Sequence, residues 1–140
     1  MEISITGKKM PYEVLDLLAD PTTVKMLATV DGAGAPNSVI MSSLTAMDEE
    51  RVMFVLFKRS KTYANLMKMK KFAATILKPD QKEGYQIKGT MEEFHDNDHL
   101  FNQIKGEVFQ RSGMTIIGVI IGGVEEVYTI SMDDPGRRLV

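Results

Sequence analysis

Alternating and continuous hydrophobic runs, separated by short turns, recur along the chain and predict a sheet of short strands. Residues 24–30 alternate with the two-residue period of a half-buried strand. A turn follows in which Gly32 and Gly34 can adopt positive φ, and a second extended segment then spans residues 36–44. These two segments predict a hairpin. Further strands are predicted at residues 52–57, 72–77, 85–91, 115–121 and 124–131.

Helical spacing of apolar residues is found in three places. Pro11 suits a first helical turn, and the apolar stripe after it stops before Asp20. Ser60 is a candidate N-cap for a second helix. A third helix is predicted between His95 and Phe109, and Gly106 leaves its length open.

The order of these elements favours a mainly β fold. We expect about six to seven antiparallel strands with two to three short helices, in a closed or nearly closed barrel. A parallel doubly wound sheet would need a helix after nearly every strand, and the pattern does not provide these. We expect residues 1–140 to form one domain and the tail from Asp133 to Val140 to be loose.

Composition narrows the function classes. The chain has 17 basic and 19 acidic residues, a net charge of −2, and therefore lacks the overall positive field of a nucleic-acid-binding protein. It has no cysteine, which excludes disulfides, thiolate metal ligands and cysteine nucleophiles. No apolar run approaches the roughly 18 residues that a membrane span needs, and no signal peptide is evident, so we expect a cytoplasmic protein.

A cluster of cations lies where the second helix is predicted to begin. Lys58, Arg59 and Lys61 flank Ser60 and Thr62. The positive end of the helix dipole disfavours each nearby cation by about 0.3 to 1 kcal/mol, and a bound anion reverses that effect. Free backbone N–H groups, two hydroxyls and an ammonium would together bind a phosphate. The alternative is an ordinary solvated basic turn.

Hydroxyl groups interrupt an apolar run near the end of the second predicted strand. The run contains Ile40, Met41, Ser42, Ser43 and Leu44. A flat apolar ring with a polar edge, such as a flavin, needs this mixture of surfaces. The alternative is that Ser42 and Ser43 simply face water on the outer side of a hairpin. Neither serine has a visible base partner, so a serine triad is not supported.

The polar stretch 95–99 contains both histidines of the chain, together with Asp96 and Asp98. These residue types are common ligands of zinc or iron. A helix start capped by an aspartate or asparagine explains the same residues without a metal, and we expect no metal site. No phosphate-loop or Rossmann glycine motif is present.

Several short motifs in order resemble one known family. These are residues 27–31 (LATVD), 34–36 (GAP), 60–66 (SKTYANL) and 84–90 (GYQIKGT). They resemble the pyridoxamine 5'-phosphate oxidase-like superfamily of flavin-binding split β-barrels, and are most similar to small bacterial FMN-binding proteins. The resemblance covers roughly residues 22–131, the expected core of the domain.

The resemblance implies FMN as cofactor and a homodimer with FMN at the subunit interface. It implies phosphate binding by Arg59, Ser60, Lys61 and Thr62. It implies that the flavin ring lies along Ile40, Met41, Ser42, Ser43 and Leu44. The second subunit would contribute the region around Tyr85 and Gln86.

Two departures from the family argue against vitamin B6 oxidation. The chain lacks the C-terminal substrate-binding extension of the true vitamin oxidases, for which Arg137 and Arg138 are a poor substitute, and it has no tryptophan. We therefore expect an FMN-dependent oxidoreductase or flavin reductase, with NAD(P)H or a redox protein as partner and no catalytic residue assigned. The alternatives are a non-enzymatic electron carrier or flavin-storage protein, and a barrel that binds no flavin or binds a deazaflavin or haem.

Overall fold

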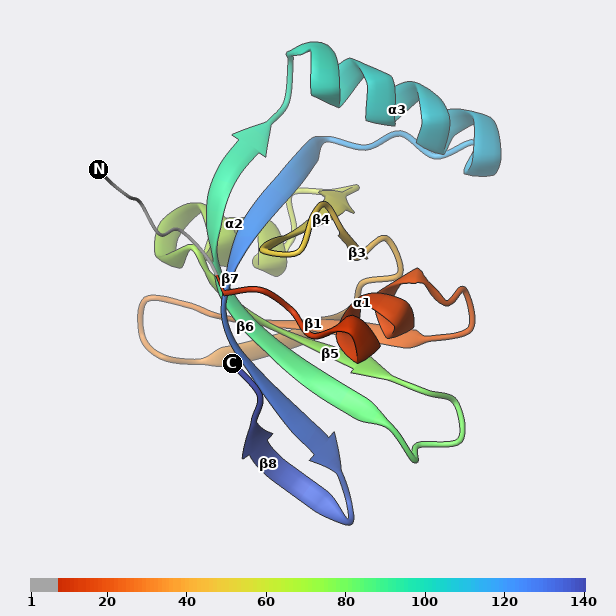
Figure 1. The fold of residues 1–140 in the computed structure, drawn as a ribbon. Helices are drawn as coiled ribbons and strands as arrows, with labels where there is room; N and C mark the ends of the chain where they lie inside the picture. Colours follow the sequence, from red (N-terminus) through yellow and green to blue (C-terminus); the bar gives the residue numbers. More distant parts are fainter. Residues whose placement is uncertain (1–7) are drawn as a thin grey trace, which may run out of the picture.

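A computed structural model describes residues 8–140, which form eight antiparallel strands in one sheet and three helices (Figure 1). The strands are β1 (Val24–Val30), β2 (Pro36–Ile40), β3 (Thr45–Ala46), β4 (Arg51–Leu56), β5 (Lys71–Leu77), β6 (Gly84–His95), β7 (Gly118–Ser131) and β8 (Asp134–Arg138). The helices are α1 (Tyr12–Ala19), α2 (Lys61–Met69) and α3 (His99–Ser112). The neighbour order is β2-β1-β5-β6-β7-β4-β3, with β8 paired to β7. The predicted mainly β split barrel is confirmed.

The first hairpin forms as predicted, with Val30 opposite Pro36 and Met26 opposite Ile40. Its turn is fixed by the Asp31 carboxylate, which accepts hydrogen bonds from the N–H groups of Ala33 and Ala35, each 2.9 Å away. The second strand is shorter than predicted. β2 ends at Ile40, and residues 41–44 leave the sheet in a turn closed by the Leu44 N–H and the Met41 carbonyl, 3.1 Å apart.

The prediction of two C-terminal strands at residues 115–121 and 124–131 is wrong. One strand, β7, begins at Gly118 inside the first segment, continues without a break to the end of the second, and pairs with β6, β4 and β8. Gly122 and Gly123 suggest a turn in the sequence, but they stay in the sheet because β4 and β6 pair with them on both sides, and neighbouring side chains leave room only for glycine. A Cβ on Gly122 would come 2.5 Å from the Phe72 ring, and one on Gly123 would collide with the Glu92 carboxylate.

The expectation of a loose tail is also wrong. Asp134–Arg138 forms β8, which is joined to β7 by hydrogen bonds from the Arg137 N–H to the Thr129 hydroxyl (2.9 Å) and from the Leu139 N–H to the Val127 carbonyl (2.8 Å). The partner strand therefore orders a segment whose own hydrophobic pattern is weak. The short strand β3 was not predicted.

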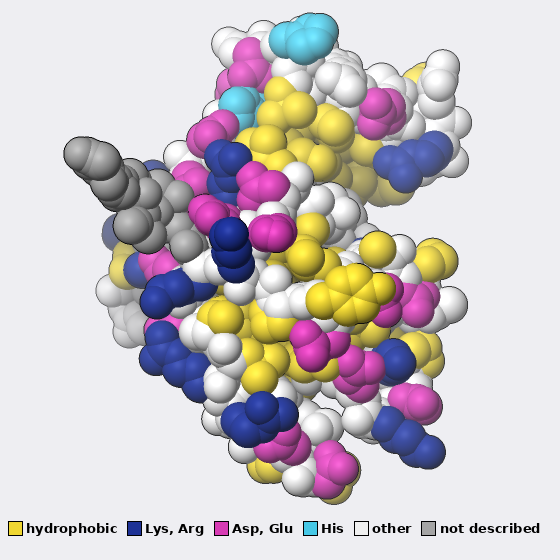
Figure 2. Space-filling model, in the orientation of Figure 1, with side chains coloured by type: hydrophobic (Ala, Val, Ile, Leu, Met, Phe, Trp, Pro, Cys, Tyr) yellow, Lys and Arg dark blue, Asp and Glu magenta, His cyan; other side chains and the backbone are white. Residues whose placement is uncertain are grey.

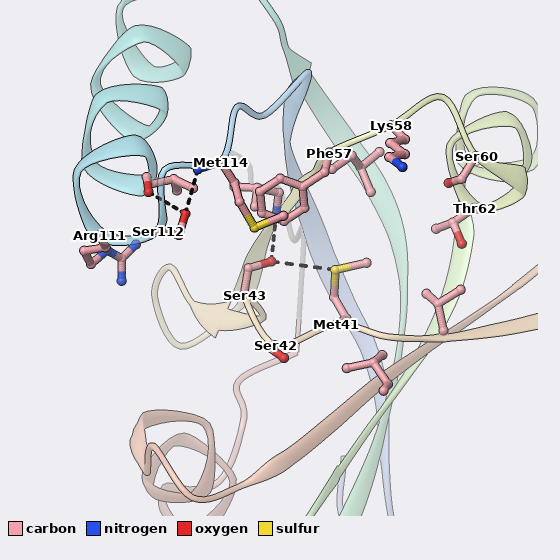
Figure 3. A pocket seen from close by; sticks show the side chains of 15 residues that line it. Met41, Ser42, Ser43, Phe57, Lys58, Ser60, Thr62, Arg111, Ser112 and Met114 are labelled. Carbon is pink, nitrogen blue, oxygen red and sulfur yellow. Dashed lines mark hydrogen bonds between the residues drawn. The ribbon is translucent and has the colours of Figure 1, made fainter.

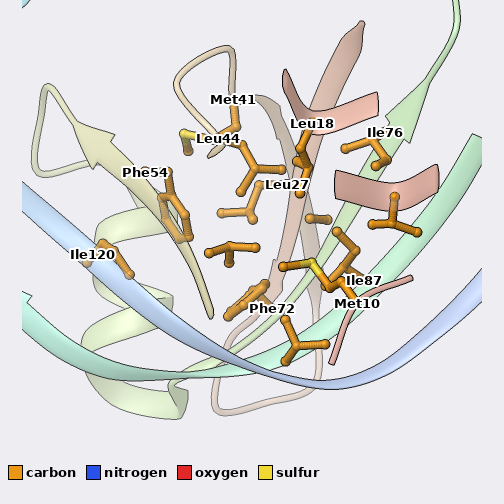
Figure 4. Packing of buried hydrophobic residues seen from close by; sticks show 14 of the residues in the cluster. Met10, Leu18, Leu27, Met41, Leu44, Phe54, Phe72, Ile76, Ile87 and Ile120 are labelled. Atoms are coloured by element: carbon orange, nitrogen blue, oxygen red, sulfur yellow. The ribbon is translucent and has the colours of Figure 1, made fainter. Parts of the chain in front are cut away.

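The core lies inside the curved sheet, where side chains from α1 and most strands meet (Figure 4). Its fully buried members include Leu18, Leu27, Leu44, Phe54, Ile76, Ile87 and Ile120. The Phe54 and Phe72 rings meet edge to face at 5.9 Å. In β1 the side chains of Leu27 and Thr29 are buried, and the residue between them is not. The predicted two-residue alternation of this strand is therefore confirmed.

Helix α3 lies apart from the main core, between the ends of β6 and β7 (Figure 1). A second, smaller cluster attaches it, comprising Val55, Phe101, Val108, Ile116 and Val119. The helix runs through Gly106 and past Phe109 to Ser112, and it ends at the C-cap Gly113, whose φ is 73°. Across residues 8–140 there is no helix with the length and apolar character required to span a bilayer.

Candidate functional site

A pocket of about 600 Å³ lies between the turn after β2, the segment that joins β4 to α2, and the end of α3 (Figure 3). It is lined by Val39, Ile40, Met41, Ser42, Ser43, Val55, Leu56, Phe57, Lys58, Ser60, Thr62, Val108, Arg111, Ser112 and Met114. The surface in Figure 2 carries hydrophobic side chains both on the lobe built around α3 and on the barrel beneath it. A volume of this size suits a small organic ligand or cofactor.

One wall of the pocket is the N-terminus of α2. Ser60 is the N-cap, as predicted, and its Oγ accepts a hydrogen bond from the Tyr63 N–H at 3.4 Å. Thr62 is 2% exposed, and its hydroxyl accepts a hydrogen bond from the Asn37 amide at 3.2 Å. Both hydroxyls can still donate a proton. The first turn of α2 contains no acidic residue, so its free N–H groups face no carboxylate of their own helix.

The cations near α2 are distributed differently from the expectation. Lys58 lines the pocket, whereas the Lys61 ammonium lies 3.4 Å from the Asp31 carboxylate. Arg59 donates a hydrogen bond to the Tyr63 hydroxyl at 3.2 Å and stacks over that ring at 5.2 Å. Backbone N–H groups in the hairpin turn, and then Lys61, lower the pKa of Asp31. Of the three cations around the start of α2, Lys58 is therefore the one that lines the pocket.

The turn at residues 41–44 forms the second wall. The Ser43 hydroxyl accepts a hydrogen bond from the Val55 N–H at 3.0 Å and lies 3.6 Å from the Met41 sulfur. Ser42 is exposed and Ile40 is 75% exposed at the rim. Leu44 is fully buried in the main core and does not line the pocket. Four of the five residues predicted along a flavin ring therefore come together here.

Lys25 holds this turn in place from behind. Its ammonium donates hydrogen bonds to the carbonyls of Leu44 (2.6 Å) and Leu18 (2.9 Å). Burial lowers the pKa of Lys25, and the Asp20 carboxylate partly opposes the effect. Lys25 therefore ties the end of α1 to the last residue of the turn.

Tyr85 and Gln86 lie on β6, outside this pocket. The Tyr85 ring is 8% exposed, and its hydroxyl donates to the Glu83 carboxylate at 2.5 Å. Burial, followed by Glu83, raises the pKa of Tyr85. Gln86 lines a separate hollow of about 420 Å³ beside Tyr128. Their proposed role at another subunit's cofactor stays a prediction.

The third wall comes from α3 and was missed by sequence reasoning. Val108, Arg111, Ser112 and Met114 reach the pocket from this side. The Ser112 hydroxyl donates to the Val108 carbonyl (2.7 Å) and accepts from the Met114 N–H (3.1 Å). No local motif marks these residues, because only the packing of α3 beside β4 and β7 brings them to the pocket.

The polar stretch 95–99 joins the end of β6 to the start of α3. Asp98 is the N-cap and accepts a hydrogen bond from the Phe101 N–H at 3.0 Å, as the capping hypothesis predicts. The two ring nitrogens of His95 face Asp98 and Glu93, the latter at 2.7 Å. Asp98 is the main cause that raises the pKa of His95. Within residues 8–140, no group of three or more histidines and carboxylates is arranged to hold a metal ion.

Comparison with known proteins gives one family match. A family model described as Pyridoxamine 5'-phosphate oxidase matches residues 10–131. No curated protein matches the sequence.

Several solved structures share the fold. HupZ from Group A Streptococcus has a TM-score of 0.79 at 22% identity, covering 94% of this chain and 99% of that one. An FMN-binding protein from Syntrophomonas wolfei has a TM-score of 0.74 at 19% identity, covering 86% and 88%. HutZ, the heme storage protein of Vibrio cholerae, has a TM-score of 0.64 at 12% identity, covering 87% and 95%. At these identities the likeness establishes the fold.

Proposed function

This chain belongs to the pyridoxamine 5'-phosphate oxidase family, and we propose that it is a flavoprotein that binds FMN in the pocket beside α2. The observation that carries the proposal is the charge of that pocket. Its described lining includes Lys58 and Arg111 and no carboxylate, although the whole chain is net negative. Such a pocket favours an anionic ligand.

The phosphate of FMN fits the α2 wall. Ser60 and Thr62 offer hydroxyl donors, Lys58 offers a charge, and the first turn of α2 offers N–H groups. Arg59 and Lys61 lie next to this position and complete the predicted set. Lys61 would reach the phosphate by leaving Asp31, with which it forms a partly exposed ion pair of small energy.

The flavin ring fits the apolar floor between the other walls. Val39, Ile40 and Met41 offer apolar contact, while Ser42 presents an uncommitted hydroxyl at the edge. Ser43 is used to fasten the turn to β4, so its role is to shape the floor. Burial of the ring here would exclude water from one of its faces.

When bound, FMN supplies hydride or electron transfer, and the protein supplies position and electrostatics. We propose an FMN-dependent oxidoreductase or flavin reductase whose partner is NAD(P)H or a redox protein. We further propose a homodimer that covers the exposed rim and adds Tyr85 and Gln86 of the second subunit to the site. Exposed apolar residues at the rim, Ile40 and Met114, support this arrangement because a partner would bury them.

The structural likeness to a heme storage protein makes haem the competing ligand. An axial histidine is a common haem ligand, yet the lining of the pocket contains none within residues 8–140. This favours FMN over haem. A deazaflavin remains the second alternative to FMN, and a carrier without turnover remains the alternative to an enzyme.

Titration of the apoprotein with FMN tests the proposal directly. We expect saturable binding, quenched flavin fluorescence and absorbance bands at about 375 and 450 nm. Parallel titrations with haem and with a deazaflavin identify the preferred ligand. Absence of saturable FMN binding would overturn the proposal. Steady-state oxidation of NADH or NADPH by the FMN-loaded protein then separates an enzyme from a carrier.

A further inference from the structure

The pocket has a second cationic position that FMN does not need. Lys58, with Ser60 and Thr62, forms the α2 wall that suits the single phosphate of FMN. Arg111 lines the pocket from the end of α3, and Figure 3 shows it on the opposite side from Lys58 and Thr62. The two cations are therefore held by different elements and face the pocket from opposite walls.

Arg111 has few partners of its own. Its Nε donates to the Glu107 carbonyl at 3.4 Å, a long contact that leaves the two terminal amino groups of the guanidinium available. Within residues 8–140, no carboxylate lies within ion-pair distance of Arg111, although six other cationic residues have such a partner. The neighbouring Ser112 hydroxyl is already used within the chain. Arg111 is thus the residue of the α3 wall whose N–H groups are available to bind a ligand.

The geometry points to Arg111 as a specificity-determining residue that binds a carboxylate or phosphate group of the substrate. This inference rests on the proposed function, because the substrate would lie in the pocket beside bound FMN. A guanidinium matches either group with two parallel hydrogen bonds, and both groups are planar or tetrahedral oxyanions of the size that an arginine fork accepts. The same pocket therefore favours an anionic substrate over its neutral analogue.

A simpler role for Arg111 is stabilisation of α3. A cation in the last turn interacts favourably with the negative end of the helix dipole. That role predicts a change in stability alone, whereas substrate binding predicts a change in ligand preference. Lys105 provides the matched control, because it lies on the same helix and stacks over Phe101, outside the pocket lining.

The test uses the FMN-loaded protein and two matched pairs of probes. Benzoate is compared with benzamide, and phenyl phosphate with phenol, by calorimetry and by the perturbation of flavin absorbance. In the unsubstituted protein we expect at least one anion to bind about tenfold more tightly than its neutral partner. The pair that shows the larger ratio distinguishes a carboxylate from a phosphate. Arg111→Gln should remove this preference and leave the affinity for the neutral probe unchanged, while Lys105→Gln should retain it.

FMN affinity, measured first on each variant, separates the two proposals. Failure of the unsubstituted protein to bind FMN would overturn the proposed function itself. Normal FMN binding without any preference for an anion would overturn the role of Arg111 alone. A loss of FMN affinity in Arg111→Gln would show that Arg111 binds the cofactor, and would also overturn its role in substrate binding. Partial retention of the anion preference in Arg111→Lys, at unchanged melting temperature, would support it.

Discussion

The two longer helices of the protein begin in opposite electrostatic surroundings. α2 starts at Ser60, with cations nearby and no acidic residue in its first turn, and its N-terminus opens on a pocket. α3 starts at Asp98, whose carboxylate caps the helix and also contacts His95. Both N-termini carry a partial positive charge. The carboxylate of Asp98 neutralises the start of α3, whereas the first turn of α2 has no acidic residue, and in the proposed function the phosphate of FMN takes that place.

The largest effect is expected when the N-cap of α2 is made acidic, like that of α3. In Ser60→Asp the new residue still caps the helix, so the fold should persist, but its charge competes with phosphate. We expect the Kd for FMN to rise about 100-fold, from the lost donor and the added repulsion. Fluorescence titration measures it, and Asp98→Ser, which keeps the α3 cap, is the control. Unchanged FMN affinity in Ser60→Asp would place the phosphate elsewhere.

A second substitution series ranks the cations near α2. Lys58→Gln should weaken FMN about tenfold, because Lys58 already lines the pocket. Lys61→Gln should weaken it by a smaller factor, since Lys61 must first leave Asp31. The same titration at two salt concentrations measures both effects. A larger loss for Lys61 than for Lys58 would show that the phosphate lies nearer the hairpin turn than the pocket suggests.

Removing the carboxylate of Asp98, the N-cap of α3, should lower stability and leave FMN binding unchanged. Asp98→Ala loses both the cap on Phe101 and the contact with His95. We expect the melting temperature to fall by about 4 °C, the usual consequence of losing an N-cap in a protein of this size. Asp98→Asn retains a capping oxygen and should recover most of that loss. A marked change in FMN affinity in Asp98→Ala would contradict the division of roles between the two helices.

The smallest expected effect is a pH dependence from His95. Asp98, followed by Glu93, raises the pKa of His95 above its ordinary value of 6.5 in the folded protein, so protonated His95 stabilises the fold. This contribution is complete below about pH 6.5 and is lost as the pH rises through the raised folded pKa. The melting-temperature difference between the protein and His95→Gln should therefore shrink by a few degrees between pH 6 and pH 9. A difference that grows with pH would reverse the assigned sign.

Local patterns predicted much of the fold. The hairpin of β1 and β2, the helix that begins after Ser60 and the capped start of α3 each depend on residues close together in the sequence. The predictions of secondary structure were wrong where contacts between residues far apart in the sequence determine the conformation. Gly122 and Gly123 signal a turn by themselves, but β4 and β6 pair with them from both sides and keep β7 continuous.

The candidate site divides in the same way. The α2 wall was predicted because a cluster of cations at a helix start is unfavourable without an anion, a rule that needs only neighbouring residues. The placement of Lys58 in the pocket and of Lys61 on Asp31 was not predictable, since it depends on how the hairpin turn lies beside α2.

The sequence by itself determined the mainly β fold class, the family resemblance and the electrostatic character of the α2 N-terminus, because periodicity, turn residues and local charge act over a few residues. Only the tertiary structure decided that α3 supplies a third wall and that Arg111 faces the pocket from across it. The physical reason is that packing of Phe101 and Val108 beside Val55 of β4 joins segments about fifty residues apart, a contact that leaves no local pattern.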